Sequence, residues 1–146
     1  MSKSIVVLNG PNLNLLGSRE TEQYGTASLA DIEALCRERA AHHGLELTFK
    51  QTNHEGDLVD WLQEAGRKAD GVVINPAGYT HTSVALQDAV RAIEIPVIEL
   101  HVSNIYAREP FRRHSYVSAV ADGVICGLGM RGYGLAIDAL AERIGQ

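Results

Sequence analysis

Two pairs of side chains in this sequence have the types and spacing that acid–base catalysis needs. The first pair, Glu99 and His101, lies two residues apart in an apolar run, so on a strand both would project from the same face. A carboxylate beside an imidazole orients the ring and favours its charged form, which suits a general acid. A salt-bridged pair at a strand end is the structural alternative. Because a Glu inside a buried strand is costly unless it is paired, the pattern favours function.

The second pair, Arg19 and Tyr24, lies at the end of a long polar stretch that begins at Leu8. We expect this stretch to form a loop without helix. A tyrosine is mostly protonated at neutral pH, so a phenolate base needs a nearby guanidinium in a site closed to water. A mobile loop with both residues could assemble such a base when it closes. The alternative is a surface aromatic beside a solvated arginine.

Other polar residues suggest an anionic ligand. Ten of the thirteen basic residues are Arg, and three of these, Arg108, Arg112 and Arg113, lie close together. Arg makes planar, multi-donor contacts with carboxylates and hydroxyls. Asn75 and His81 flank a turn before a predicted helix, where a histidine tends to be neutral and can bond a hydroxyl. A solvated charge run and a capping histidine are the structural alternatives.

Several other chemistries are disfavoured. No His or Cys pair has metal-ligand spacing with a second pair to complete it, and there is no Walker loop or GxGxxG motif after a strand. The three lysines fall at strand starts or on polar helix faces, which argues against a Schiff base. Cys36 and Cys126 are expected on a helix and a buried strand, as reduced core thiols away from any catalytic His. The sequence therefore predicts no metal and no cofactor.

The elements that must position these residues alternate between strand and helix. Continuous or alternating apolar runs predict strands at 4–9, 45–51, 71–75, 96–101 and 123–127. Helical spacing predicts a helix capped by Ser28 and ended by Gly44, and further helices at 56–68, 82–93 and 134–144. Such alternation indicates a parallel sheet covered on both faces. We expect an α/β, flavodoxin-like three-layer sandwich, with a five-stranded parallel sheet of order 2-1-3-4-5, as one catalytic domain over residues 1–146.

Ligands of such sheets bind beyond the carboxyl ends of the strands, near the point where the strand order reverses. The residues that follow the first, third and fourth strands are polar or titratable, and the opposite strand ends show nothing comparable. The sequence therefore predicts one rim that holds the chemistry.

Bulk composition limits the partners. A formal net charge of −5 without a basic run argues against nucleic acid. The first ten residues lack the apolar stretch of a signal peptide, and no window is apolar enough for a membrane span. We therefore expect a cytoplasmic protein that acts on a small molecule.

Four motifs occur in order over nearly the whole chain: LNGPNLNLLGSRE followed by YG, NPAGYTHTSVALQDA, PVIELHVSNIYAREPFRRHS and GLGMRGYGLA. With these motifs the sequence resembles type II 3-dehydroquinate dehydratase, the small flavodoxin-like enzyme of the shikimate pathway. The resemblance implies dehydration of 3-dehydroquinate, a small anionic cyclic substrate, to 3-dehydroshikimate without metal or cofactor. It also implies a homododecamer built from trimers.

The resemblance further assigns roles to residues. Tyr24 corresponds to the base, Arg19 stabilises its phenolate, and His101 corresponds to the acid, supported by Glu99. Asn12 corresponds to the residue that holds a water against the enolate. Substrate-binding positions correspond to Asn75, His81, Asp88, Val102, Ser103 and Arg112. Asp88 would reach the site of a neighbouring subunit.

Two positions depart from the family pattern: Thr21, where many members have Pro, and Arg113, where His is common. Neither removes a chemical group that the reaction needs. A flavodoxin-like cofactor-binding protein is the first alternative, but the loop after the first strand has no hydroxyl until Ser18. A phospho-receiver domain would need acids where Asn9 and Asn75 stand. A purely structural oligomer leaves the paired Arg, Tyr, Glu and His unexplained.

Overall fold

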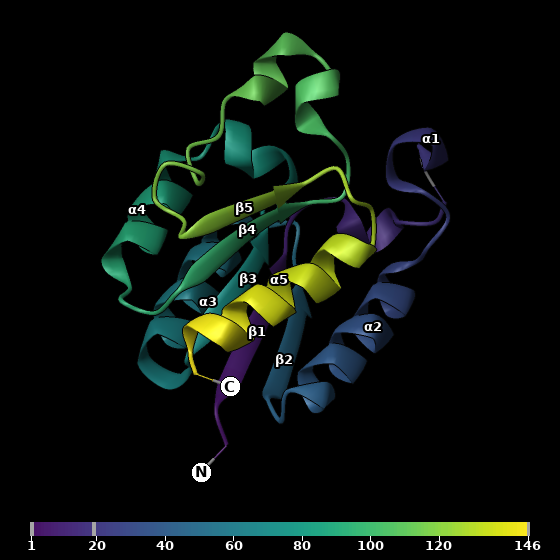
Figure 1. The fold of residues 1–146 in the computed structure, drawn as a ribbon. Coiled ribbons are helices and arrows are strands. Elements are labelled where there is room, and N and C mark those ends of the chain that lie inside the picture. Colours follow the sequence, from purple (N-terminus) through teal and green to yellow (C-terminus); the bar gives the residue numbers. More distant parts are fainter. Residues whose placement is uncertain (1, 19, 146) are drawn as a thin grey trace.

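A five-stranded parallel sheet forms the centre of the molecule in the computed structural model, which describes residues 2–18 and 20–145 (Figure 1). The strands run in the order β2-β1-β3-β4-β5. They are β1 (Ser4–Asn9), β2 (Glu46–Gln51), β3 (Gly71–Asn75), β4 (Val97–His101) and β5 (Gly123–Cys126). The predicted strand order is confirmed.

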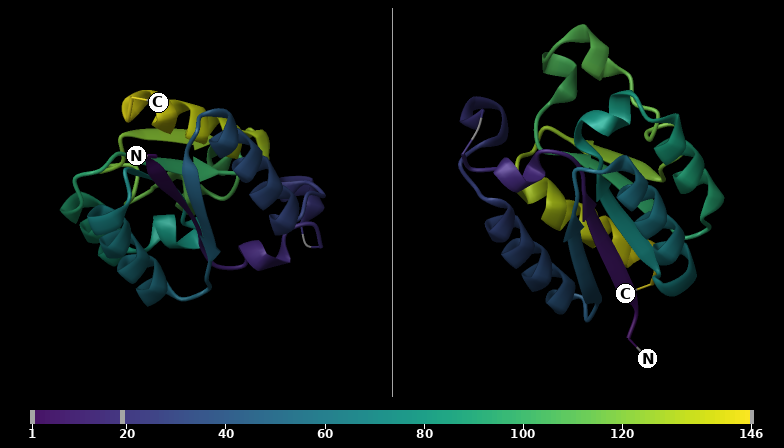
Figure 2. Two further views of the ribbon diagram at one scale, coloured as in Figure 1. Left: turned by 90° about the horizontal axis from the view of Figure 1, so that it is seen from below. Right: turned by 180° about the vertical axis from the view of Figure 1, so that it is seen from behind.

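Helices cover both faces of the sheet, as strand–helix alternation requires. Helices α2 (Leu29–His42) and α5 (Arg131–Arg143) lie on one face, and α3 (Glu55–Lys68) and α4 (Val84–Ala92) lie on the other (Figure 2). Each face buries its own apolar cluster. The three-layer sandwich is therefore confirmed. Within the described ranges, no helix is long and apolar enough to cross a membrane.

Local chemistry fixes the helix starts. Ser28 accepts a hydrogen bond from the Asp31 backbone N–H, and Asp31 bonds back to the Ser28 N–H, which is a complete capping box at the start of α2. The Ser83 hydroxyl oxygen accepts from the Leu86 N–H and caps α4. This cap places the start of α4 two residues later than the predicted helix at 82–93.

The last helix begins earlier than the predicted range of 134–144. It starts at Arg131, because Gly132 acts as a packing residue and does not break the helix. A Cβ added at Gly132 would lie 2.6 Å from Leu100 Cδ1. The absence of a side chain therefore lets the first turn of α5 lie directly against β4.

The expectation of a helix-free stretch over residues 8–25 is wrong. Two short turns interrupt it: the 3-10 turn η1 (Leu13–Leu15) and the one-turn helix α1 (Thr21–Tyr24). Leu13 and Leu16 are almost fully buried and pin the segment to the core. Their burial explains why the chain turns locally here although most of the stretch is polar.

Cys126 differs from the expectation in two respects, whereas Cys36 is buried as expected. Both are free, and burial raises the pKa of the Cys36 thiol to about 12. Cys126, however, is only partly buried, because β5 is the last strand of the sheet and its outer edge is unpaired within the described chain. The register also pairs Cys126 with His101, so this thiol lies on the strand beside a rim histidine.

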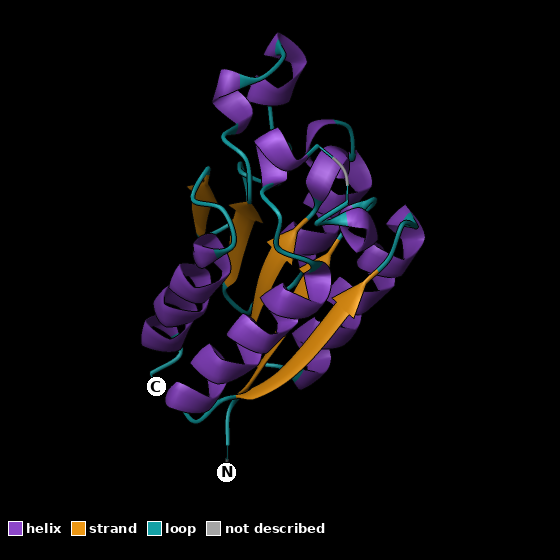
Figure 3. Ribbon diagram, turned by 90° about the vertical axis from the view of Figure 1, so that its right-hand side faces the viewer, coloured by secondary structure: helices purple, strands orange, loops and turns teal. Residues whose placement is uncertain are grey.

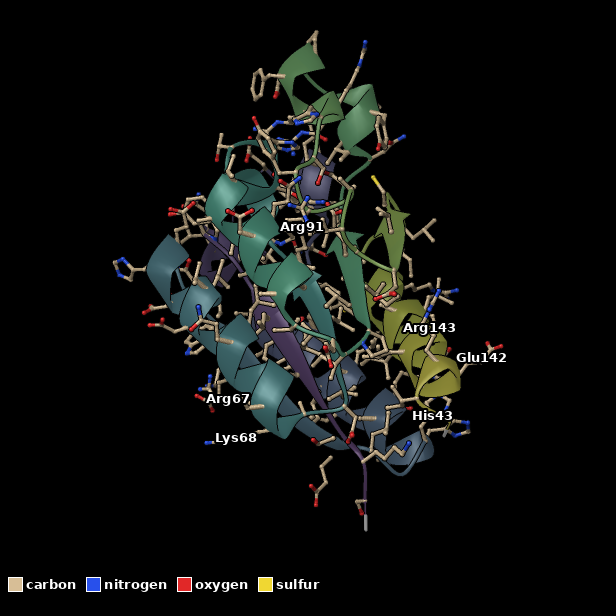
Figure 4. All side chains as sticks on the ribbon, turned by 90° about the vertical axis from the view of Figure 1, so that its left-hand side faces the viewer. His43, Arg67, Lys68, Arg91, Glu142 and Arg143 are labelled. Carbon is tan, nitrogen blue, oxygen red and sulfur yellow. The ribbon has the colours of Figure 1, made fainter. Side chains whose placement is uncertain are left out.

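The strands all end at one edge of the sheet, and the irregular segments gather there (Figure 3). Above this edge stand α1 and three 3-10 turns: η2 (Ala77–His81), η3 (Ile105–Ala107) and η4 (Pro110–Arg113). The C-terminal ends of α2 and α3 lie on the opposite side, where Arg67, Lys68 and His43 point outward far from the rim (Figure 4). The fold therefore separates the rim residues from these outlying charges.

Candidate active site

A pocket of about 120 Å³ opens at the carboxyl ends of the strands. It lies where the predicted reversal of strand order places a ligand, between the segments that follow β1, β3 and β4. Eight of the predicted site residues line it: Asn12, Tyr24, Asn75, His81, His101, Val102, Ser103 and Arg112.

Glu99 and His101 form the buried half of the site. Both side chains point to the same face of β4, and His101 Nε2 lies 2.5 Å from Glu99 Oε2. Burial by itself raises the pKa of Glu99, but the hydrogen bond and charge of His101, with the Ser118 and Thr80 hydroxyls, outweigh it and hold that pKa below its usual value. Glu99 is therefore ionised, and its carboxylate accepts the hydrogen bond from His101 Nε2. The other ring nitrogen, Nδ1, is left to exchange a proton with the pocket.

His81 stacks beside this pair, with its ring centroid 6.3 Å from that of His101. Its Nδ1–H donates to the backbone oxygen of His114 (2.8 Å), so its Nε2 is free to accept a hydrogen bond from a ligand. Burial lowers the pKa of His81, and the nearby charges of His101 and Arg112 lower it further. The lowered pKa favours the neutral ring, but the cause is burial, and His81 is the last residue of η2, not part of the first turn of α4 as the sequence suggested.

Tyr24 faces the pocket from the end of α1. Arg108 Nη1 donates to the Tyr24 hydroxyl oxygen (2.8 Å) and to the Ser103 hydroxyl oxygen (3.2 Å). The guanidinium carbon also lies 5.3 Å from the centre of the Tyr24 ring. A guanidinium in this position stabilises negative charge on the phenolic oxygen. Arg19, the partner predicted from the sequence, lies outside the described residues.

Asn75 is held rigidly at the end of β3. Its Nδ2 donates to the Tyr133 hydroxyl (2.9 Å) and its Oδ1 accepts from the Ala77 N–H (3.1 Å). The fully buried Tyr133 hydroxyl in turn donates to Asn9 Oδ1 (2.7 Å). These bonds fix the orientation of the Asn75 amide. The second N–H of Nδ2 therefore keeps one orientation, in which it can donate to a ligand.

Asn12 sits at the mouth of the pocket in a left-handed conformation, with φ of 69°. Asn has a short polar side chain that tolerates this region better than most residues. Its backbone N–H donates to Asn53 Oδ1 (2.9 Å), from the segment that follows β2. The loop after the edge strand therefore supports the residue assigned to hold a water.

The arginine cluster divides between the pocket and the solvent. Arg108 and Arg112 line the pocket, whereas Arg113 is exposed. Arg112 Nε lies 2.5 Å from Glu109 Oε2, and this bond lowers the pKa of Glu109. Arg112 therefore lines the pocket while it remains bonded to Glu109.

Asp88 is the described site residue that the structure places elsewhere. It lies on α4, is exposed, and does not line the pocket. This position is the one that the family resemblance assigns to a neighbouring subunit.

Sequence reasoning missed four residues of the site. Arg108 was noticed only as one member of an arginine cluster, although it contacts Tyr24. Three hydroxyls on Glu99 were not assigned either: those of Thr80, Ser115 and Ser118. The sequence signal for them was the buried Glu itself, since a buried carboxylate requires several donors.

No metal-binding cluster accompanies these groups in the part of the chain that the structure describes. Among the described residues, no three His, Cys, Asp or Glu side chains gather where they could hold one ion.

Comparisons with known proteins agree with this geometry. The family model described as "Dehydroquinase class II" matches residues 3–141. A 3-dehydroquinate dehydratase of Azorhizobium caulinodans is 63% identical over 97% of this chain and 95% of its own length. The enzyme of the same name from Acidovorax sp. (strain JS42) is 58% identical over 97% of this chain and 99% of its own.

Solved structures show the same likeness. The type II dehydroquinase from Propionibacterium acnes superimposes with a TM-score of 0.93 at 46% identity, over 97% of this chain and 98% of that one. With the family model covering nearly the whole chain, and relatives far above the level of chance likeness, the chain belongs to the class II dehydroquinase family.

Proposed function

We propose a mechanism for the dehydration of 3-dehydroquinate to 3-dehydroshikimate, the hydro-lyase activity that goes with membership of this family. One observation carries it: a guanidinium on the hydroxyl of Tyr24 and an ionised Glu99 on the imidazole of His101 serve the same pocket. This arrangement suits a base on one side of a ring and an acid on the other.

Tyr24 acts as the base in its phenolate form. It takes the proton from the carbon beside the ketone, and the electron pair of the broken C–H bond moves onto the ketone oxygen to give an enolate. Arg108 supports the phenolate, since its Nη1 already donates to that oxygen. Arg19 remains proposed for the same purpose, with the loop closing over the substrate.

His101 acts as the acid in the second step. The enolate re-forms the ketone, the bond to the β-hydroxyl breaks, and the departing oxygen takes the proton from His101 Nδ1 to leave as water. Glu99 holds Nε2 and stabilises the positive ring before the transfer. The phenol and the neutral imidazole then exchange protons with solvent, which restores the starting state.

The remaining pocket residues bind the substrate and the developing charge. Asn12 holds a water that donates to the enolate oxygen, as a neutral donor aimed where charge appears. The substrate carboxylate sits on the backbone amides of Val102 and Ser103 and on the Ser103 hydroxyl. The ring hydroxyls bond the neutral His81 and the fixed amide of Asn75, and Arg112 closes the rim.

The same proposal includes the assembly and the location. The chain forms one catalytic domain over residues 1–146, assembled as a homododecamer of trimers in which Asp88 completes a neighbouring site. Its exposure on α4 supports this, since the side chain is free to meet another subunit. It acts in the cytoplasm on a small molecule, with no nucleic acid, membrane or cofactor as partner, and its two free cysteines fit a reducing compartment.

The test is direct. Purified protein and 3-dehydroquinate should give the ultraviolet absorbance of the conjugated product, and borohydride should leave the rate unchanged, because no imine forms. Tyr24→Phe and His101→Ala should each lower kcat by about 10²–10⁴-fold without unfolding. Tyr106→Phe is the matched control, since Tyr106 is an exposed rim tyrosine outside the pocket. Near-normal turnover in either catalytic variant would refute its assigned role.

A further inference from the structure

The carboxylate of Glu99 is fully buried and receives side chains from three separate segments. On Oε2 it accepts from His101 Nε2 at 2.5 Å, Thr80 Oγ1 at 2.8 Å and Ser115 Oγ at 2.9 Å. On Oε1 it accepts from the Ser118 hydroxyl. The proposed function uses the histidine but assigns no role to the hydroxyls.

The three hydroxyls differ in whether another donor can replace them, because each has only one proton to donate. Thr80 Oγ1 and Ser115 Oγ also lie 2.6 Å apart, and each has a single hydroxyl proton. If one donates to the other, the partner still donates to Glu99, so these two can replace each other. Ser118 has no such substitute, since it is the donor that the described residues supply to Oε1.

Ser118 is also held in place by the backbone. Its own N–H donates to Ser115 Oγ (3.1 Å), and the Tyr116 N–H donates to the backbone carbonyl oxygen of Thr80 (2.8 Å). These bonds tie the segment after η4 to η2. These two bonds therefore hold the turn that directs the Ser118 hydroxyl toward Glu99. This turn follows η4, the segment that includes Arg112.

We propose that Ser118 is a positioning residue of the reaction: its hydroxyl keeps the Glu99 carboxylate charged and correctly turned, so that His101 presents Nδ1 to the leaving oxygen. This inference rests on the proposed function. Ser118 does not line the pocket and acts only through Glu99 and His101.

Two titratable groups interact with Glu99 among the described residues: His101 on its own strand and His81 on η2. From the paired strands, its register neighbours are Ile74 on β3 and Val124 on β5, which are uncharged. A change in the titration of Glu99 after substitution of Ser118 would therefore be compared with the titration of these two histidines.

The experiment compares Ser118→Ala with Ser118→Thr, which keeps the hydroxyl. Removing a donor to the charged form raises the pKa of Glu99, so the acid limb of the kcat profile should move to higher pH by about one unit or more. In Ser118→Ala, kcat at the lower end of the range should fall about tenfold while KM changes little, and Ser118→Thr should restore the parent profile.

Asp122→Ala is the matched control. Asp122 Oδ2 accepts from the Val97 N–H (2.8 Å) at the opposite end of β4, so its loss weakens the same strand without touching Glu99. A Ser118→Ala profile that matches the parent, or a pH-independent loss like that of Asp122→Ala, would overturn the inference. If Ser118→Ala does not fold, Ser118→Cys, with its weaker donor, should show a smaller shift in the same direction.

A second readout does not depend on turnover. Carbon-13 NMR of glutamate-labelled protein, with Glu99→Gln for assignment, should show the Glu99 carboxyl titrating at higher pH in Ser118→Ala than in the parent. If the parent failed to dehydrate 3-dehydroquinate but this shift appeared, the proposed function would fail and the link between Ser118 and Glu99 would stand. An unchanged titration in an active enzyme would refute the role of Ser118.

Discussion

At the scale of single residues, the site depends on side chains that each satisfy two partners at once. Arg108 joins the Tyr24 and Ser103 hydroxyls through one nitrogen, and Tyr133 joins Asn9 and Asn75 through one oxygen. Each bridge ties two side chains of the site to one shared partner and so fixes their relative positions. Precise positioning of this kind is what a reaction with separate base and acid requires.

Arg108→Lys tests the first bridge. An ammonium is a point charge and cannot hold the planar contacts of a guanidinium, so we expect kcat/KM to fall about tenfold or more. The absorbance assay measures this. Arg113→Lys, on the exposed neighbour outside the pocket, should keep the parent rate. Equal rates in the two variants would show that Arg108 only covers the pocket.

Tyr133→Phe tests the second bridge. It leaves Asn9 Oδ1 and Asn75 Nδ2 without their buried partner, so the free energy of unfolding should fall by about 1–3 kcal/mol. Because the Asn75 amide then keeps only its bond from the Ala77 N–H, it is held less firmly, and KM for the substrate should rise as well. Urea unfolding and steady-state kinetics check the two effects, and a stability loss with unchanged KM would remove Asn75 from substrate binding.

The roles could be predicted for residues with a recognisable pattern, and not for residues whose partners are distant in the sequence. The spacing of Glu99 and His101 puts both on one strand face, and the structure pairs them at 2.5 Å. The contact between Tyr24 and Arg108 joins segments 84 residues apart, and no local pattern encodes it. The hydroxyls of Ser115 and Ser118 were missed for the same reason, because they reach Glu99 from an irregular segment.

At the scale of elements, apolar periodicity predicted the strands and helices, because it depends on local sequence, and their alternation with the flavodoxin-like expectation predicted the strand order. It misplaced the start of α5, since glycine indicates a break in isolation but a close approach to β4 in the fold. It also missed η1, where Leu13 and the following Leu16 are buried in the core, and the one-turn helix α1, which has no buried residue.

Two glycines test how closely the elements pack. A Cβ added at Gly10, just after β1, would lie 2.6 Å from the Pro76 backbone oxygen, which cannot rotate away, so Gly10→Ala should destabilise by about 1–3 kcal/mol. Gly56 in α3 has open space around it, and Gly56→Ala should stabilise by about 0.5–1 kcal/mol. Urea unfolding measures both. Effects of the same sign would contradict the packing described at the rim.

At the scale of the whole molecule, eight predicted site residues line the pocket and Glu99 bonds one of them, His101, whereas Asp88 lies apart on α4. This is the geometry expected if the catalytic unit is larger than one chain. Light scattering should give a mass twelve times that of the 15.8 kDa chain. A monomer of full activity would refute the proposed assembly.

Mixed oligomers test the contribution of Asp88 itself. Asp88→Asn and Tyr24→Phe subunits should each be impaired alone. When co-expressed, they should regain activity, because an intact Tyr24 in one chain can combine with an intact Asp88 from its neighbour. If the mixture is no more active than the two variants measured separately, Asp88 does not act across subunits.

The central claim is that Tyr24 removes a carbon-bound proton in a first step and His101 acts in a second. Proton NMR in deuterated water can follow exchange at the carbon beside the ketone of 3-dehydroquinate, against the rate without enzyme. We expect His101→Ala to catalyse this exchange while forming almost no product, and Tyr24→Phe to catalyse neither. Exchange by Tyr24→Phe at the rate of His101→Ala would contradict the account, because the base would then be another group.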